Sequence, residues 1–424
     1  MKQRKQKKKV EWTRLDNASK IFPAVCNDKD TKVFRIACEL HEPVVPGILQ
    51  QALNLAVEGF PLFRSVLRRG IFWYYFESSE LKPVVEIESE PVCAPIYSKE
   101  KRNLLFRVFY FNNRISLEIF HALSDGTGAL WFMKTLVYHY LLIRNKRAMK
   151  EMPKLNYDVS ISKGMDDSFG RYFCGRDNGG NKENKNGRKY DHVYHIRGTR
   201  NEENRMKLIE GCMSAGAVLD EAHKYNTTLT VYIASLLIYS IYREMPAYGR
   251  DRPIVLSVPI NLRQFFESKT ARNFFSTMEA GFCPDKNDAG FADIIQSVSA
   301  DFKSELTAER MSKKLNRFMS LEKNLLARMT PLPLKNYFLR LANKKMDKDI
   351  TASISNVGRI FMPPELEPFI RQFSIFTSAR RLQICMCSYG DKLVISFTSP
   401  FTETEIQRTF FEFLSEREIG RAHV

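Results

Sequence analysis

The sequence contains no C-x-x-C pair, no signal-peptide core and no apolar run long enough to cross a membrane. Its eight cysteines are scattered along 424 residues, so we expect neither a disulfide scaffold nor a cysteine-based metal site, and a reducing compartment is favoured. The most apolar stretch, Leu229 to Tyr242, has fourteen residues, whereas a membrane span needs about 20. We therefore expect a soluble, cytoplasmic protein with a buried core helix at this stretch and no bound metal.

Acidic residues are scarce relative to basic ones, because 48 Asp and Glu stand against 65 Lys and Arg and give a net charge of +17. Six of the basic residues lie within the first nine positions. We expect residues 1–10 to be a disordered tail that makes at most a weak contact with a membrane surface. The rest of the chain has no zinc-finger, helix-turn-helix or RNA-binding signature, so no nucleic-acid partner is expected.

A polar segment divides the chain into two parts. The composition, with 44% hydrophobic and 27% charged residues, is that of a globular protein, and the length predicts two or three domains. Residues 174–190 are rich in Gly, Asn and Lys and predict a linker or exposed loop. We expect an N-terminal subdomain over 11–173 and a C-terminal subdomain over 191–424. Both mix strands and helices without a regular β-α-β alternation, which indicates an α/β protein of the α+β type.

Hydrophobic periodicity predicts individual elements in both parts. A helical spacing runs from Val45 to Phe60. The β-rich segments Leu104–Phe111 and Ile115–Phe120 flank an Asn-Asn turn, as in a hairpin. Residues Asn204 to Lys224 are expected to be helical. Four strands are expected near the C-terminus: Ile350–Ser355, Gln372–Thr377, Leu382–Ser388 and Lys392–Thr398.

The segment most indicative of chemistry is His121-Ala-Leu-Ser-Asp125-Gly126, which follows a predicted strand and precedes a predicted helix. Histidine has an unperturbed pKa of about 6.5 and can accept a proton at neutral pH. Asp125 could orient the imidazole, pair with a distant arginine or cap the next helix, and Gly126 leaves room for a ligand. The same pattern also fits a histidine that merely ends a strand.

No nucleophile accompanies this histidine. The sequence has no G-x-S-x-G elbow and no cysteine in a recognisable catalytic context. A histidine base without a nucleophile suggests direct transfer, in which the base deprotonates a hydroxyl, amine or thiol that then attacks an already activated acyl group.

The H-x-x-x-D-G segment after a strand resembles the motif of acyl-CoA-dependent acyltransferases, the superfamily of chloramphenicol acetyltransferase, peptide-synthetase condensation domains and plant BAHD enzymes. Further segments resemble alcohol acetyltransferase-like members, and their order spans nearly the whole chain. They are Trp12-x-x-Leu-x-Asn-Ala-Ser-Lys-Ile-Phe22-Pro23, Pro61-Leu-Phe-Arg64 with Gly70-x-x-Trp-Tyr, Val258-Pro-Ile-Asn261-Leu-Arg263, Thr270-Ala-Arg-Asn273-Phe and Ser355-Asn356-Val-Gly358.

Two departures narrow the resemblance to the alcohol acetyltransferase-like branch. Phe120 stands where condensation domains and chloramphenicol acetyltransferase usually have a first histidine, and the plant-type D-F-G-W-G motif is absent. The resemblance implies two chloramphenicol-acetyltransferase-like subdomains, each a mixed sheet flanked by helices, with a channel between them. No carrier domain is visible, so the implied donor is a free acyl-CoA such as acetyl-CoA, used as a co-substrate with no tightly bound cofactor.

The resemblance also implies roles for individual residues. His121 would be the general base, Asp125 would pair with Arg263 as a structural salt bridge, and Gly126 completes the motif. Ser355 and Asn356 are candidates for oxyanion or substrate binding, although an ordinary strand end entering a turn explains them equally well. The expected protein is a monomer that acylates a small alcohol or amine by a sequential mechanism. Two alternatives stay open: a carrier-protein thioester as donor, and a non-catalytic binding relative of the same fold.

Overall fold

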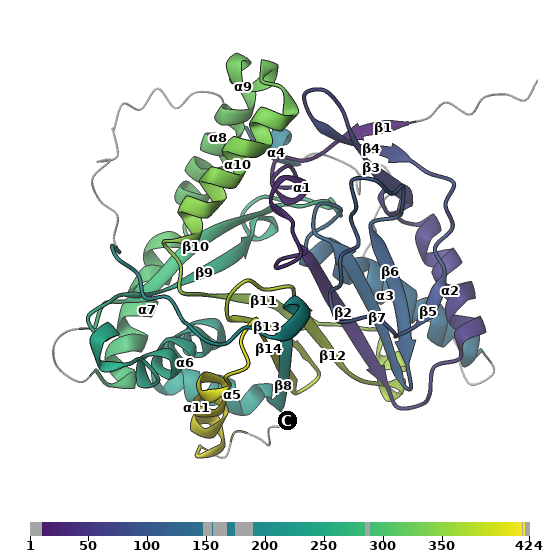
Figure 1. Cartoon of the computed structure of the whole chain (residues 1–424). Coiled ribbons are helices and arrows are strands. Elements are labelled where there is room, and N and C mark those ends of the chain that lie inside the picture. Colours follow the sequence, from purple (N-terminus) through teal and green to yellow (C-terminus); the bar gives the residue numbers. More distant parts are fainter. Residues whose placement is uncertain are drawn as a thin grey trace, which may run out of the picture.

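A computed structural model describes residues 11–146, 155, 168–173, 190–284, 289–417 and 419 (Figure 1). The expected basic tail and all but the last residue of the expected linker lie outside these residues. The described chain forms two main sheets and one small sheet, with helices packed on their outer faces. The short helical turns are α1 (Phe22–Val25), η1 (Pro61–Arg64), α4 (Ser168–Arg171), η3 (Glu202–Asn204), η4 (Ala247–Gly249), η5 (Leu262–Gln264) and η6 (Pro364–Phe369).

The first sheet has five strands in the order β12-β2-β7-β6-β5, and only the β5–β6 pair is parallel. The helix expected from Val45 is confirmed as α2, which packs against α3 on the outer side of this sheet (Figure 1). The hairpin expected across the Asn-Asn turn is confirmed as β6 and β7. The elements are β2 (Val33–Leu40), α2 (Pro46–Glu58), β5 (Val85–Ile87), β6 (Phe106–Phe111), β7 (Arg114–Phe120), α3 (Gly126–Arg144) and β12 (Ile370–Thr377).

A small antiparallel sheet lies beside the first and has the order β1-β4-β3. Its strands are β1 (Trp12–Arg14), β3 (Ser65–Arg69) and β4 (Tyr74–Ser78). The backbone N–H of Gly70 donates to the carbonyl of Trp73 and closes the turn between β3 and β4.

The second sheet has six strands in the order β10-β9-β11-β13-β14-β8, and β11 runs parallel to both of its neighbours. The apolar stretch from Leu229 is confirmed as a core helix, α6, with eleven buried residues. The elements are β8 (Lys207–Ser214), α5 (Ala215–Lys224), α6 (Leu229–Arg243), β9 (Ile254–Asn261), β10 (Phe275–Phe282), α7 (Phe291–Glu305), β11 (Ala352–Ile360), β13 (Gln383–Tyr389), β14 (Lys392–Ser399) and α11 (Glu405–Ser415).

The expectation of one helix from Asn204 to Lys224 is wrong for its first half. Residues Lys207 to Ser214 form β8, which pairs antiparallel with β14 along its whole length. Helix α5 begins only at Ala215, where the Ser214 hydroxyl accepts a hydrogen bond from the Ala217 N–H and caps the helix. Pairing with a distant strand outweighs the local helical spacing of the apolar residues.

One strand departs from the division of the chain expected at residue 191. Strand β12 comes from the C-terminal part but pairs antiparallel with β2, so it completes the first sheet. The backbone then returns through residues 378–382 to β13 in the second sheet. The two halves are therefore tied together by a strand as well as by packing.

Three helices project from the body of the protein (Figure 1). They are α8 (Ala308–Lys323), α9 (Leu325–Met329) and α10 (Leu332–Asp347), with α9 at the far end. In the part of the chain that the structure describes, no helix combines the length and apolar character needed to cross a membrane.

Candidate active site

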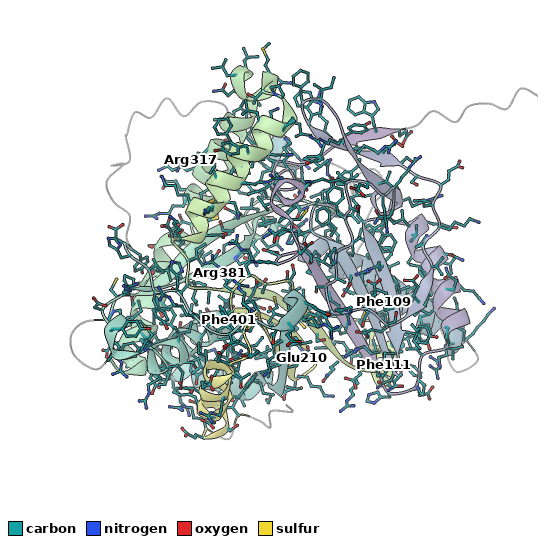
Figure 2. The ribbon with its side chains drawn as sticks, in the orientation of Figure 1. Phe109, Phe111, Glu210, Arg317, Arg381 and Phe401 are labelled. Carbon is teal, nitrogen blue, oxygen red and sulfur yellow. The ribbon has the colours of Figure 1, made fainter. Side chains whose placement is uncertain are left out.

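A cavity of about 240 Å³ lies between the part of the protein built on the first sheet and the part built on the second sheet. We call these parts the first half and the second half. His121 and Gly126 line it from the first half, and Ser353 and Ser355 of β11 line it from the second. The loop between β12 and β13 closes another side with residues 378–381, including Arg381 (Figure 2). The H-x-x-x-D-G segment therefore faces a space that a ligand can enter from solvent.

His121 is held at the end of β7 by its backbone and by aromatic packing. Its N–H donates to the Lys32 carbonyl at 2.8 Å, which continues the pairing of β7 with β2 beyond Phe120. The imidazole stacks on Phe22, with ring centroids 4.4 Å apart and planes inclined by 18°, and Phe34 and Phe275 flank it. The ring is thus half-buried among aromatic side chains and lies at the cavity wall.

Asn273 decides which ring nitrogen of His121 carries a proton. The amide nitrogen of Asn273 donates to the His121 carbonyl at 3.0 Å and to the Ser19 hydroxyl at 2.9 Å, so its amide oxygen is the atom that lies 3.1 Å from Nδ1. An amide oxygen only accepts, and Nδ1 therefore carries the proton. None of the hydrogen bonds found among the described residues goes to Nε2, whose lone pair stays available.

Burial is the main influence on the protonation of His121 and lowers the pKa of the imidazole below its ordinary value of 6.5. The hydrogen bond to its own backbone, the charge of Asp125 and the hydrogen bond to Asn273 act in the opposite direction, whereas Lys32 adds to the lowering. The neutral imidazole thus predominates at pH 7, and this is the form that can accept a proton.

The carboxylate of Asp125 is engaged by α3 and by Arg263. One oxygen accepts from the Gly128 N–H at 2.9 Å and caps α3, and the other accepts from the Arg263 guanidinium at 2.7 Å and from the Phe274 N–H at 2.9 Å. Both charged side chains are more than nine-tenths buried. Among the described residues no hydrogen bond joins this carboxylate to the His121 ring, so the structure supports the helix cap and the arginine pair rather than a triad.

Arg263 connects Asp125 to the loop that carries Asn273, the residue that binds the His121 ring. Its guanidinium donates to the carbonyls of Thr270 and Arg272, at 2.8 and 2.7 Å. These two residues precede Asn273 in the same loop. The salt bridge therefore fixes a loop of the second half against the start of α3, and this loop places the Asn273 amide on the imidazole.

Glycines allow this close approach between loop and helix. A Cβ added at Gly128 would lie 2.1 Å from the carbonyl oxygen of Ala271, so only glycine fits there. At Gly126, the nearest atom to an added Cβ is a methyl group of Val357 at 3.6 Å, which is an ordinary contact. Gly126 therefore widens the cavity, whereas Gly128 is required for packing.

The two oxyanion candidates lie in different places. Ser355 lines the cavity together with Ser353, because residues two apart on a strand point to the same side. Asn356 is exposed, and its amide nitrogen donates to the Thr230 hydroxyl at 2.8 Å while its oxygen accepts from the Gly358 N–H. The structure brings Ser355 to the cavity of His121 and does not bring the side chain of Asn356 there.

Charged side chains that sequence reasoning did not single out surround the cavity. Lys32 pairs with Asp30 at 2.6 Å, and Asp347 pairs with Arg380 at 2.7 Å and with Arg381 at 3.4 Å. Three cations against two carboxylates leave the wall with an excess of positive charge. Within the described residues, no group of three or more His, Cys, Asp or Glu side chains is arranged to hold a metal ion.

Known structures share this architecture across nearly the whole chain, although no family model and no curated protein sequence matches. Polyketide synthase associated protein 5 from Mycobacterium tuberculosis has a TM-score of 0.61 at 12% identity, over 95% of this chain and 96% of that one. Trichothecene 15-O-acetyltransferase from Fusarium sporotrichioides has a TM-score of 0.62 at 10% identity, over 96% and 95%. The first condensation domain of the calcium-dependent antibiotic synthetase has a TM-score of 0.59 at 15% identity, over 98% of both chains.

These similarities concern the fold. The chain has the mixed α/β fold with two sheet-containing subdomains that condensation domains and this acetyltransferase share, which confirms the expected fold class. Similar folds host different activities, so the chemistry of this chain has to be argued from its own site.

Proposed function

We propose that this protein transfers an acyl group from an acyl-CoA to a hydroxyl or amine acceptor, with His121 as the general base. One observation carries the proposal: an imidazole held through Nδ1 by Asn273 lies at the wall of a cavity between the two halves. Burial lowers the pKa of this imidazole, which favours its neutral form. With Nδ1 protonated, Nε2 is the atom that takes the proton of the acceptor.

The reaction requires no covalent enzyme intermediate. Nε2 removes the proton from the acceptor while the acceptor oxygen or nitrogen forms a bond to the thioester carbonyl carbon. The tetrahedral intermediate then breaks its carbon–sulfur bond, and the thiolate of CoA receives the proton from Nε2. Both substrates must be bound together for this step. Holding them side by side lowers the entropic part of the barrier, and the requirement for both predicts sequential kinetics.

The hydroxyl of Ser355 is our candidate hydrogen-bond donor to the oxyanion of the tetrahedral intermediate, because Ser355 lines the same cavity as His121. Asn356 has a different part in the proposal. Its side chain accepts from the Gly358 N–H at the position where β11 bulges, and Gly358 has a φ of +88° that favours glycine. Asn356 would thus fix the backbone that presents Ser355.

The proposed donor suits the charge of the cavity. CoA carries phosphates, and Lys32, Arg380 and Arg381 supply cations at the cavity wall. A structural neighbour, the starter condensation domain of rhizomide synthetase, was crystallised as a mutant in complex with C8-CoA, with a TM-score of 0.59 at 11% identity. Acetyl-CoA is the donor we would test first.

The test is a thiol-release assay with acyl-CoAs against a panel of alcohols and amines. Loss of the general base in His121→Ala should lower kcat by about 10²–10⁴-fold, whereas His41→Ala, at an exposed histidine outside the cavity, should leave the rate unchanged. Undiminished turnover by His121→Ala, or an acyl group trapped covalently on the protein, contradicts the proposal. Turnover only with a carrier-protein thioester favours that donor, and no turnover with any donor favours a binding relative.

A further inference from the structure

We propose that α9 and α10 dock this protein onto the surface of an anionic membrane. The inference rests on the exposed face of these helices, and it holds whether or not the protein transfers acyl groups. It also does not involve the basic tail, because the residues that it uses lie in α8, α9, α10 and the adjacent turn between β3 and β4.

Helix α10 carries its apolar stripe on the side that faces away from the protein. The stripe follows the i, i+3, i+4, i+7 spacing of one helical face, and between 46% and 57% of each residue's surface is exposed. A surface helix of a globular protein normally turns such a stripe towards the core. The stripe consists of Leu334, Tyr337, Phe338 and Leu341.

The opposite face of α10 holds the helix on the protein, so its orientation is determined by specific contacts. Leu332 and Asn336 are buried, and the Asn336 amide donates to the Tyr74 hydroxyl at 2.9 Å. One turn later, the Arg340 guanidinium donates to the Ala24 carbonyl at 2.7 Å. These residues are four apart and define the inward side, which leaves the apolar stripe outside.

The apolar surface continues over the end of the projection. In α9, Leu325, Leu326 and Met329 have between 72% and 80% of their surfaces exposed. The exposed Ile71, in the turn between β3 and β4, lies next to the start of α10, because its carbonyl accepts from the Leu332 N–H at 2.8 Å. We call these four residues and the stripe of α10 the apolar tip.

The basic residues around the apolar tip indicate that its binding surface is an anionic bilayer. From Asn324 to Met346 the chain has five basic residues and no acidic one. Exposed apolar side chains beside basic residues are the pattern of helices that lie in the interface of anionic membranes. The basic residues are Arg328, Lys335, Arg340, Lys344 and Lys345, of which Arg340 lies on the inward side and binds the Ala24 carbonyl.

Shape supports the same assignment. The three helices project from the body (Figure 1), and Arg317 on α8 places a further cation on the projection (Figure 2). A projecting surface can be embedded in a flat, extended interface without a complementary groove. Helix α10 ends at Asp347, which lines the cavity, so docking would hold the cavity within about 24 Å of the bilayer, the length of a 16-residue helix.

The test is flotation of the full chain with vesicles of phosphatidylcholine and phosphatidylserine, compared with vesicles of phosphatidylcholine alone. The variant Phe338→Glu/Leu341→Glu places charges in the apolar tip. The matched control Phe111→Glu/Leu55→Glu changes similarly exposed residues on β6 and α2. We expect the unmodified protein and the control to float with the mixed vesicles, and the tip variant to lose at least tenfold in partitioning, because apolar burial drives the insertion.

A second variant tests how much the basic residues contribute to membrane binding. Lys344→Gln/Lys345→Gln should weaken binding to the mixed vesicles by about fivefold for each charge removed, and this difference should shrink at high salt. The basic tail is identical in all variants and cannot account for these differences.

Three results overturn the proposal. The first is a tip variant that floats as well as the unmodified protein, and the second is an unmodified protein that does not float at all. The third is a dimer in light scattering that Phe338→Glu/Leu341→Glu breaks, since the apolar tip would then bind a second copy of the chain.

Discussion

Replacing Asp125 by asparagine separates a structural role of this residue from a chemical one. Asp125→Asn keeps the shape of the side chain and removes its charge. One carboxylate oxygen now accepts from both Arg263 and the Phe274 N–H, and the other accepts from Gly128. An amide has a single accepting oxygen, so at least one of these donors will face an NH₂ group.

The magnitude follows from the burial of the pair. The Asp125 and Arg263 side chains expose only 7% and 8% of their surfaces. Removing one partner of a buried ion pair leaves an uncompensated charge and costs about 3–5 kcal/mol. The double variant Asp125→Asn/Arg263→Met removes that charge as well, so its loss of stability should be smaller than the sum of the two single losses by at least about 1 kcal/mol.

Urea unfolding followed by tryptophan fluorescence measures this effect. Trp131 on α3, one of three tryptophans in the chain, has its ring centre 5.6 Å from the Arg263 guanidinium, so part of the emission comes from a position next to the pair. As a control, Glu309→Gln removes an exposed ion pair with Lys313 on α8 and should not change the unfolding midpoint measurably. If Asp125→Asn unfolds at the same urea concentration as the unmodified protein yet loses acyl transfer, the structural account is refuted and Asp125 belongs to the chemistry.

Three further predictions concern the same region. Because burial lowers the pKa of His121 and the base must be unprotonated, the acid limb of the kcat/KM–pH profile should have its midpoint below 6.5, and a midpoint above this value would contradict the assignment. Asn273→Ala removes a hydrogen bond that raises the pKa of His121 and orients its ring, so kcat should fall by about 10–10²-fold and the acid limb should move to lower pH; a fall in kcat without this movement indicates only a packing role. Gly128→Ala should destabilise the protein by about 1–3 kcal/mol or more in thermal unfolding, since the new methyl group meets the Ala271 carbonyl, whereas Gly47→Ala, on an open face of α2, should stabilise it by up to about 1 kcal/mol.

Local patterns in the sequence predicted the elements whose cause is local. The hairpin from Phe106 to Phe120 follows from two β-rich segments across an Asn-Asn turn, and α6 follows from fourteen apolar-rich residues that are too few for a membrane span. The prediction failed at β8, where the spacing of apolar residues is compatible with a helix. Eight residues there pair instead with β14, which lies nearly 200 residues away in the chain.

The outward orientation of α10 also could not be predicted from a local sequence pattern. An apolar stripe at helical spacing predicts a helix, but the usual inference that the stripe faces the core does not apply here. Asn336 and Arg340 bind Tyr74 and Ala24, and these contacts on the polar side decide how the helix is turned. Such contacts join segments more than 250 residues apart, so no short window of sequence contains them.

The sequence by itself determined the chemistry that is available: a histidine with no nucleophile beside it, an aspartate four residues later and glycines around them. Only the tertiary structure decided how these groups act. It paired Asp125 with Arg263, placed the Asn273 amide on the imidazole and turned Asn356 away from the cavity while Ser355 faces it. The physical reason is that side-chain identity and backbone preference are local properties, whereas hydrogen bonds, burial and the resulting pKa of His121 depend on residues that meet only when both halves of the chain have folded together.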